Sequence, residues 1–267
     1  LIKTDSNGNE EWNKTFGGEK NEIGKSIIQT SDGGYAIGAT KDLGAFYGEE
    51  DFYLIKTDVS GNEEWSKTFG EGGADQLWDL IESSDGGLVL VGSNQCISDC
   101  NGNNRDVWLI KTDSDGNEEW NRKLELDVNA YSDDVGHSIE QTKDGGYIIS
   151  GQSSFKSLLV KTKNDGSLDW YRVVGESTLN SVELTLIGDE GFITVGESLI
   201  RTDHLGIELW NIELKTIFGT NGANGFSVIQ IEDGGFVITG GVNGIGQGND
   251  LMIVKTDKNG KFIKYSD

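Results

Sequence analysis

A short phrase recurs six times along the chain, and this repetition is the strongest constraint on the fold. The phrase joins Leu-Ile-Lys-Thr-Asp, a turn and Gly-Asn-Glu-Glu-Trp at 1–12, 54–65 and 109–120, with weaker copies at 159–170, 199–210 and 253–264. A second phrase, built on an Asp-Gly-Gly or Asp-Glu-Gly turn, stands between the copies at 27–40, 80–93, 139–152, 185–197 and 229–241. Self-similarity at a period of roughly 40–55 residues indicates a repeat architecture.

Each repeat predicts four short strands separated by turns. In the first full repeat we expect them at Lys25–Thr30, Tyr35–Thr40, Phe52–Asp58 and Asn62–Phe69. Gly supplies the positive φ that both hairpin turns need, and β-branched and aromatic residues fill the strands. No segment reads as a helix. Four-stranded antiparallel sheets repeated along a chain predict an all-β protein, a β-propeller of four-stranded antiparallel blades.

The repeats cover the whole chain, so we expect a single β-propeller domain over 1–267 with about six blade positions. Residues 1–18 supply only the last two strands of a blade and form an N-terminal half-blade. Five complete blades follow at 23–70, 76–125, 135–173, 180–214 and 224–267. The strand at Leu1–Asp5 then has an unpaired inner edge, and exposed edges recruit partners. We therefore expect the chain's own C-terminal region, or another copy in a self-associated assembly, to cover it.

The hairpin between the last two strands of a repeat predicts which side chains meet. With a three-residue loop, Lys56 lies opposite Glu64, and Ile55 lies opposite Trp65. The same pairing places Lys111 by Glu119. We expect the repeated Lys to form cross-strand ion pairs and the repeated Trp to be wedged between neighbouring blades, so both have structural roles.

The Gly-x-x-x-Trp spacing after a strand and turn, followed by an Asp-Gly-Gly hairpin, resembles the quinoprotein-type (PQQ-like) propeller repeat. It resembles more closely the propeller repeats of secreted bacterial and archaeal cell-surface proteins. The resemblance covers essentially the whole chain and implies a propeller fold and an extracellular or cell-envelope location. It implies no particular activity. The phrase is also similar to the sialidase Asp-box, but Gly8, Gly61 and Gly116 stand four residues before their Trp instead of three, so we carry no sialidase chemistry over.

Composition excludes some partners. The chain has 22 Lys and Arg against 45 Asp and Glu, a formal charge of −23. This argues against nucleic acid, whose phosphates need clustered cations, and against anionic membrane surfaces. No apolar run reaches the ~18–20 residues of a membrane helix, so we expect no membrane insertion. The absence of an initiator Met and of a signal peptide favours a processed chain or an excised piece.

Two classes of connection are long: those from the second to the third strand of a repeat, and those from one repeat to the next. In a propeller both classes emerge on the same side, and variable loops on a rigid scaffold are where binding functions usually lie. We expect this face to bind a protein or a glycan through Phe46, Tyr47, Asp51, Asp75, Arg105, Asp106, Tyr131, Asp134 and Asp250.

Acidic residues recur at the start of the first and third strands of the repeats. These two strands are two spacings apart, roughly 9–10 Å, so one ion does not join both acids of a blade. We therefore expect each Asp to cap its own loop by accepting backbone N–H groups. The best calcium candidate is the insertion whose oxygens come from Asp99, Asn101, Asn103 and Asp106. No other cofactor is indicated.

The only cysteines are Cys96 and Cys100. We expect a local disulfide, which implies an oxidising compartment. Two free thiols remain an alternative, and a zinc site is a weaker one because no His or second Cys pair is near.

Catalysis has little support in the sequence. There is no nucleophile elbow, phosphate loop or dinucleotide fingerprint. His137, near Asp133 and Asp134, is the one acid–base candidate, and its alternative interpretation is a solvated His at a loop edge. We expect a non-enzymatic extracellular or cell-envelope propeller that binds or assembles at a surface. A lectin-like module is the alternative. A lyase or hydrolase comes third and needs a pair of carboxylates with strongly perturbed pKa in one pocket.

Overall fold

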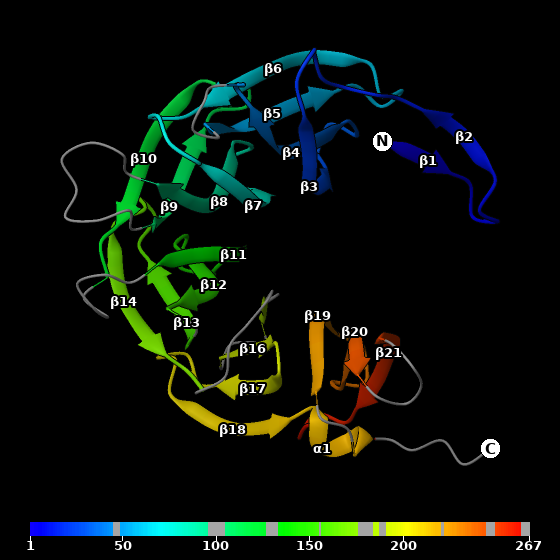
Figure 1. Ribbon diagram of the computed structural model, residues 1–267, viewed down its shortest axis with the longest axis vertical. Coiled ribbons are helices and arrows are strands. Elements are labelled where there is room, and N and C mark those ends of the chain that lie inside the picture. Colours follow the sequence, from blue (N-terminus) through cyan, green and yellow to red (C-terminus); the bar gives the residue numbers. More distant parts are fainter. Residues whose placement is uncertain are drawn as a thin grey trace. The chain divides into compact units, whose positions relative to one another are not determined.

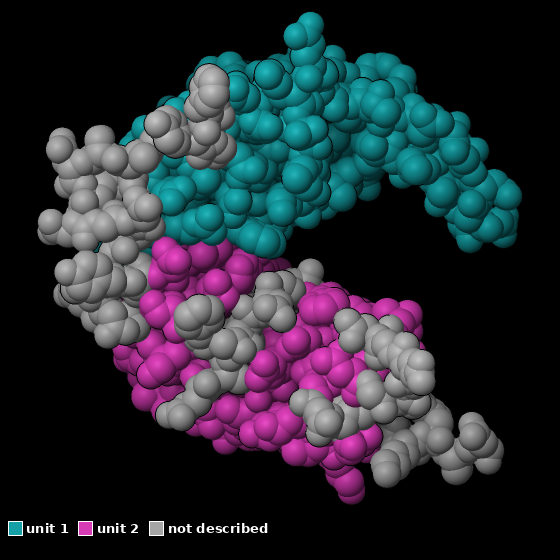
Figure 2. All heavy atoms as spheres, in the orientation of Figure 1, with its two compact units in different colours: residues 1–131 teal, residues 132–267 magenta. Residues whose placement is uncertain are grey.

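The computed structural model describes residues 1–44, 49–95, 105–126, 133–154, 156–175, 184–186, 191–219, 222–243 and 249–262. Its elements are antiparallel sheets that follow one another in chain order (Figure 1). The chain divides into two compact units, Leu1–Tyr131 and Ser132–Asp267 (Figure 2). None of the helices in the described ranges is long and apolar enough to cross a membrane.

Unit 1 holds a two-stranded sheet and two four-stranded sheets. The two-stranded sheet is β1 (Ile2–Thr4) and β2 (Glu10–Asn13). The next sheet is β3 (Glu22–Gln29), β4 (Tyr35–Asp42), β5 (Glu50–Thr57) and β6 (Glu63–Phe69). The third is β7 (Gln76–Glu82), β8 (Leu88–Gln95), β9 (Arg105–Thr112) and β10 (Glu118–Leu124).

Unit 2 holds two four-stranded sheets and one three-stranded sheet. The first is β11 (Asp134–Gln141), β12 (Tyr147–Ser153), β13 (Lys156–Thr162) and β14 (Leu168–Val173). The second is β15 (Leu184–Leu186), β16 (Phe192–Val195), β17 (Ser198–Thr202) and β18 (Glu208–Glu213). After the short helix α1 (Lys215–Phe218) comes the third, β19 (Gly222–Gln230), β20 (Phe236–Asn243) and β21 (Asn249–Thr256).

The all-β propeller prediction is confirmed. Consecutive strands pair in order within each sheet, which is the topology of a propeller blade. The predicted half-blade is the sheet β1–β2. In the last sheet, the described residues add to β21 only a single bridge between Thr256 and Phe262.

The predicted hairpin register is wrong by one residue. Thr57 faces Glu63 as expected, but a bulge follows, so Lys56 faces Trp65 and Ile55 faces Ser66. A register shift recurs at the same place in β9–β10, β13–β14 and β17–β18. The bulge inserts one unpaired residue, which a count from the turn does not anticipate.

The predicted ion pairs form despite the bulge. Lys56 Nζ lies 3.1 Å from Glu64 Oε2 and 2.7 Å from Asp32 Oδ2, with only 8% of its side chain exposed. Lys111 repeats this arrangement with Glu119 and Asp85. The acid on the neighbouring strand was predicted from the hairpin, and the acid in the Asp-Gly-Gly turn was not. Each Lys is therefore a buried cation that ties that turn to its sheet.

The repeated Trp residues fit against glycines of the next sheet. A Cβ on Gly116, whose φ is +76°, would come within 2.6 Å of the Trp65 ring. Gly61 meets Trp12 in the same way, and in unit 2 Gly206 meets Trp170 and Gly260 meets Trp210. Trp65 is thus wedged between sheets as predicted. Gly61, Gly116 and Gly206 each stand four residues before the Trp of their own sheet, so each serves both its turn and the Trp of the preceding sheet.

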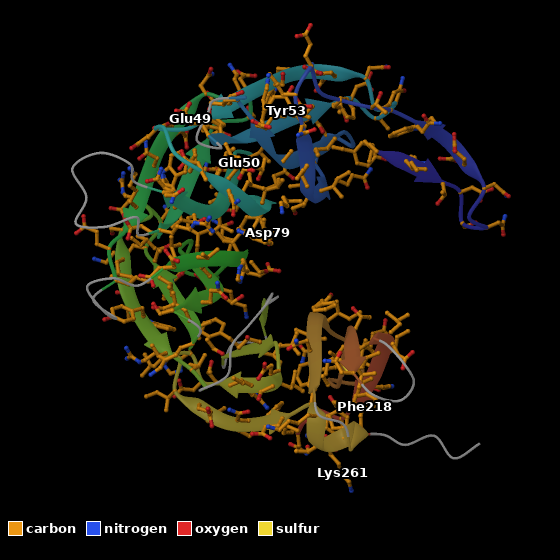
Figure 3. The ribbon with its side chains drawn as sticks, in the orientation of Figure 1. Glu49, Glu50, Tyr53, Asp79, Phe218 and Lys261 are labelled. Atoms are coloured by element: carbon orange, nitrogen blue, oxygen red, sulfur yellow. The ribbon has the colours of Figure 1, made fainter. Side chains whose placement is uncertain are left out.

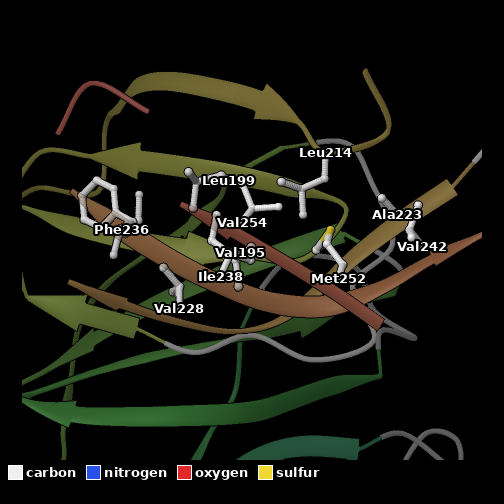
Figure 4. Close-up of a cluster of buried hydrophobic side chains, with 11 residues drawn as sticks. Val195, Leu199, Leu214, Ala223, Val228, Phe236, Ile238, Val242, Met252 and Val254 are labelled. Carbon is white, nitrogen blue, oxygen red and sulfur yellow. The ribbon is translucent and has the colours of Figure 1, made fainter. Parts of the chain in front are cut away.

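Apolar side chains between adjacent sheets form the core. In unit 1 Phe52 and Leu54 pack against Leu77, Leu80 and Trp108 of the next sheet. The rings of Phe52 and Trp108 have centroids 4.8 Å apart. In unit 2 a cluster of buried apolar residues joins the last two sheets around Leu199, Ile238 and Met252 (Figure 4).

Candidate functional site

Carboxyl groups gather in unit 1 where β5 begins and the chain approaches β7. We call Glu49, Glu50, Asp51 and Asp75 the acidic edge; Figure 3 labels the first two. Backbone bonds hold the loop before β7 against β5: Glu50 N donates to Gly73 O over 2.9 Å, and Asp75 N donates to Glu50 O over 2.7 Å. These bonds place Asp75 of one sheet beside the start of the third strand of the preceding sheet.

Asp75 is fully buried and fully hydrogen-bonded. Its Oδ1 accepts from Asn94 Nδ2 over 2.6 Å and from the Gln95 backbone N–H over 3.1 Å. Its Oδ2 accepts from the Glu71 backbone N–H over 3.0 Å. Burial nevertheless raises the pKa of Asp75 to about 6, and the charge of Asp51 contributes to the rise. Asp75 therefore caps its loops, as expected for these acids, and is poised to change protonation near neutral pH.

Asp51 is half-buried, and no hydrogen bond reaches its carboxylate from the residues that the structure describes. Burial raises its pKa, the charge of Glu49 raises it further, and the opposing cation is Lys41 on the paired strand. Gly70 packs so closely that a Cβ there would lie 1.8 Å from Asp51 Oδ1. Asp51 is thus a partly accessible acid whose ionisation its surroundings disfavour.

A second layer of side chains holds Glu50. Gln76 Nε2 donates to Glu50 Oε2 over 2.7 Å. Arg105 Nη1 makes a long contact of 3.4 Å with Gln76 Oε1. The predicted site residue Arg105 therefore reaches the acidic edge through Gln76.

Buried polar oxygens without partners lie at the ends of β4 and β8. Thr40 Oγ1, Ser93 Oγ and Asn94 Oδ1 have no hydrogen-bond partner among the described residues. Asn94 is 1% exposed and its amide nitrogen already binds Asp75. Because buried polar groups are almost always hydrogen-bonded, the Asn94 oxygen requires a donor and the two hydroxyl groups require a donor or an acceptor, from water or a ligand. Nothing in the repeat pattern distinguished these three residues beforehand.

The other predicted site residues are dispersed. Asp106 takes the place of Asp51 one sheet later; burial raises its pKa, as does Glu125, while Lys123 opposes. In unit 2 Asp134 is buried and Asp250 is exposed. The following lie outside the described residues: Phe46, Tyr47, Cys96, Asp99, Cys100, Asn101, Asn103 and Tyr131.

The calcium site and the disulfide consequently stay predictions. Within the described ranges, no group of three His, Cys, Asp or Glu side chains is arranged to hold a metal ion.

The solvated interpretation of His137 is wrong. His137 is 8% exposed, and burial lowers its pKa to about 4. It occupies the irregular position of the β11–β12 pairing, between Gly136 and Ser138. The imidazole is neutral at physiological pH and enclosed in its sheet.

The structure also corrects the pairing of acids considered from sequence. The first and third strands of one blade are too far apart for their acids to interact. The residues that interact are Asp51 on the third strand of one sheet and Asp75 before the first strand of the next. Adjacent sheets bring these positions together, while the strands of one sheet separate them.

Comparison with known proteins shows the fold alone. No family model matches the chain, and no curated protein matches it. A Bacteroides caccae protein of unknown function superposes with a TM-score of 0.61 at 11% identity, over 96% of this chain and 85% of that one. A Dyadobacter fermentans protein of unknown function gives 0.55 at 11% identity, over 91% and 81%.

The expectation of a non-enzymatic module is overturned, because similar solved structures include enzymes. One is a GH43 β-xylosidase/α-arabinofuranosidase from a compost microbial metagenome, with a TM-score of 0.47 at 10% identity over 92% of this chain and 95% of that one. Another is a GH43 β-1,3-galactosidase, at 0.49 and 11% over 96% and 58%. At this identity and these TM-scores neither enzyme transfers its activity to this chain.

Proposed function

We propose that the acidic edge of unit 1 is the acid–base centre of a hydrolase that cleaves a glycosidic bond, with Asp51 as the proton donor. One observation carries the proposal: Asp51 is a half-buried carboxyl group that no described residue hydrogen-bonds, and it stands among three further carboxyl groups. A structural carboxylate in such a place is normally paired with donors, as Asp75 is.

The surroundings of Asp51 suit a general acid. Burial and the charge of Glu49 raise its pKa, so the carboxyl group keeps its proton to a higher pH than an exposed Asp. In the reaction, Asp51 gives that proton to the leaving oxygen as the bond from the anomeric carbon to that oxygen breaks. A water molecule adds to the anomeric carbon and passes a proton to Glu49. Two carboxyl groups with these roles are what glycoside hydrolysis requires.

The proposed substrate class follows from the unpartnered oxygens. Thr40, Ser93 and Asn94 offer buried acceptors beside the acidic edge. Sugar hydroxyls and the water needed for hydrolysis are donors of the kind these oxygens lack. Asp75 is fully buried beside this edge and does not itself touch a substrate.

The test is hydrolysis of a panel of 4-nitrophenyl pyranosides and furanosides and of short oligosaccharides. We expect the wild-type chain to release product, and Asp51→Asn to lower the rate by about 100-fold or more. Glu10→Gln, which removes an exposed carboxyl group in β2, is the matched control and should keep the wild-type rate. Circular dichroism must show all three proteins folded. A folded wild-type chain inactive on the whole panel, or an Asp51→Asn variant at full rate, refutes the proposal.

We also propose that the protein works outside the cell or in the cell envelope. Support comes from the similarity of its repeats to quinoprotein-type repeats and to those of secreted cell-surface proteins. Fractionation of the source organism with an antibody to the chain tests this. Detection in the cytosolic fraction alone would contradict it.

A further inference from the structure

Lys41 lies directly opposite Asp51 where β4 pairs with β5. Directly opposed residues share one face of the sheet, with Cβ atoms about 4.5–5.5 Å apart. Even so, no hydrogen bond or close ion pair joins the two side chains in the part of the chain that the structure describes. The Lys41 ammonium lies instead over the Tyr53 ring, 4.6 Å from its centroid. Lys41 therefore acts on Asp51 through its charge and not through contact.

Tyr53 holds the Lys41 ammonium in a defined place. Tyr53 follows Asp51 by two residues on β5, so both side chains stand on the same face of the sheet. The Tyr53 side chain, labelled in Figure 3, is 8% exposed and packs in a cluster with Ala39 and Ile55. A cation over an aromatic face is attracted to it, and here the core fixes the ring. The ring thus keeps Lys41 near Asp51 without letting the two groups pair.

The other two Asp residues at this repeat position have no cation opposite them. Asn94 faces Asp106 in the pairing of β8 with β9, and Val242 faces Asp250 in the pairing of β20 with β21. Both facing side chains are uncharged. The repeat scaffold therefore does not require a Lys at the position of Lys41, and the cation belongs to the sheet that carries the proposed proton donor.

The other charged groups around this pair are acids. From the strands and loops packed against Asp51 and Lys41 they are Glu22, Asp42, Glu49, Glu50, Glu71 and Asp75. The charge of Glu49 acts against ionisation of Asp51, and Lys41 is the cation whose charge favours it. A carboxylate formed at Asp51 consequently depends on Lys41 for electrostatic support.

We infer, on the basis of the proposed function, that Lys41 held over the Tyr53 ring is the positioning residue for proton donation, because it stabilises the carboxylate that Asp51 becomes when it protonates the leaving oxygen. A direct ion pair would hold Asp51 ionised before the reaction, and an ionised Asp51 has no proton to give. A cation kept at a short distance leaves the proton in place and still lowers the energy of the charge that develops in the transition state.

The dependence of kcat and KM on pH tests the inference. Lys41→Met should lower kcat by about 10-fold, leave KM unchanged and move the alkaline limb to higher pH, because Asp51 becomes a weaker acid. Tyr53→Leu frees the ammonium to approach Asp51 and should move that limb to lower pH. The conservative variants Lys41→Arg and Tyr53→Phe keep the charge and the ring, so their profiles should lie closer to the wild type. Lys25→Met is the matched control, because Lys25 stacks in the same way on Trp78, 4.4 Å from its centroid.

An NMR titration of the Asp51 carboxyl group separates this inference from the proposed function. The midpoint should rise in Lys41→Met, fall in Tyr53→Leu and stay in Lys25→Met. An unchanged midpoint in Lys41→Met, or an equal change in Lys25→Met, overturns the inference. Lys41 is only half-buried, so Lys41→Met decides the test even if Tyr53→Leu does not fold. An inactive wild type with the expected midpoints refutes the hydrolase and leaves the influence of Lys41 on Asp51 intact; an active wild type whose pH profile Lys41→Met does not change refutes the role of Lys41.

Discussion

The contact between Trp65 and Gly116 makes a quantitative prediction about how the sheets hold together. Gly116→Ala introduces two unfavourable terms. Its φ of +76° is a conformation that Ala adopts at about 1 kcal/mol or more, and its Cβ would lie 2.6 Å from the Trp65 ring. Overpacking of that kind typically destabilises by about 1–3 kcal/mol. We therefore expect Gly116→Ala to lower the free energy of unfolding by about 2–4 kcal/mol.

Trp65→Ala separates the two terms. Removing this half-buried ring should destabilise the chain by about 3 kcal/mol by itself. In the Trp65→Ala background, Gly116→Ala loses the steric term and should cost only the remaining about 1 kcal/mol. The double-mutant cycle should thus show a coupling of about 1–3 kcal/mol between the two positions.

Urea denaturation followed by far-ultraviolet circular dichroism measures all four proteins. Gly33→Ala is the matched control, because Gly33 has a φ of +87° and no atom within 4 Å of its would-be Cβ. It should show the conformational term alone. If Gly116→Ala costs no more than Gly33→Ala, or if the two changes at 65 and 116 are additive, the proposed contact between the sheets is wrong.

Three further predictions concern buried and paired ionisable groups. Hydrogen bonds and ion pairs hold the pKa of Asp32, Asp85 and Asp144 at about 2 against an ordinary 3.8, so the stability they contribute is present above pH 3.8 and lost as pH falls towards 2. Urea denaturation between pH 6 and 2 should show this loss of stability, although solvent screening reduces it because these side chains are more than half exposed. A variant with Asn at all three positions should show a flatter dependence of stability on pH. Burial lowers the pKa of His137 to about 4 from an ordinary 6.5, so the free energy of unfolding should fall as pH drops from 6.5 to 4. His137→Gln should abolish that part of the pH dependence, and an NMR titration that gives the His137 ring a midpoint near pH 6.5 would contradict the prediction. The Lys111 side chain is 3% exposed and lies between two hydrated acids. Lys111→Met keeps the volume of the side chain, so in urea denaturation this variant should be about 2 kcal/mol more stable than Lys111→Ala. The reverse order would show that side-chain volume does not determine stability at this position.

The candidate site was only partly predictable. Loop length singled out Asp51, Asp75, Arg105 and Asp106, since long loops on one side of a repeat scaffold can be counted from sequence. Their interaction was not predictable, because it depends on how one sheet approaches the next. Several acceptors that define the site were missed for the same reason: a Thr, Ser or Asn at the end of a strand looks the same whether or not a partner reaches it.

The sequence alone determined the all-β class, the number of sheets, the strand order and the half-blade. These features follow from local physics: the period of the repeats, strand propensity, and turns in which only Gly adopts the positive φ without strain. The tertiary structure decided which residues of neighbouring strands and sheets contact one another. The second acid on each buried Lys and the Trp65–Gly116 contact depend on packing between segments distant in sequence, and the bulge between Lys56 and Thr57 is not visible in the pattern of residue types. Such contacts depend on shape and distance in three dimensions, which a pattern of residue types along one chain does not specify.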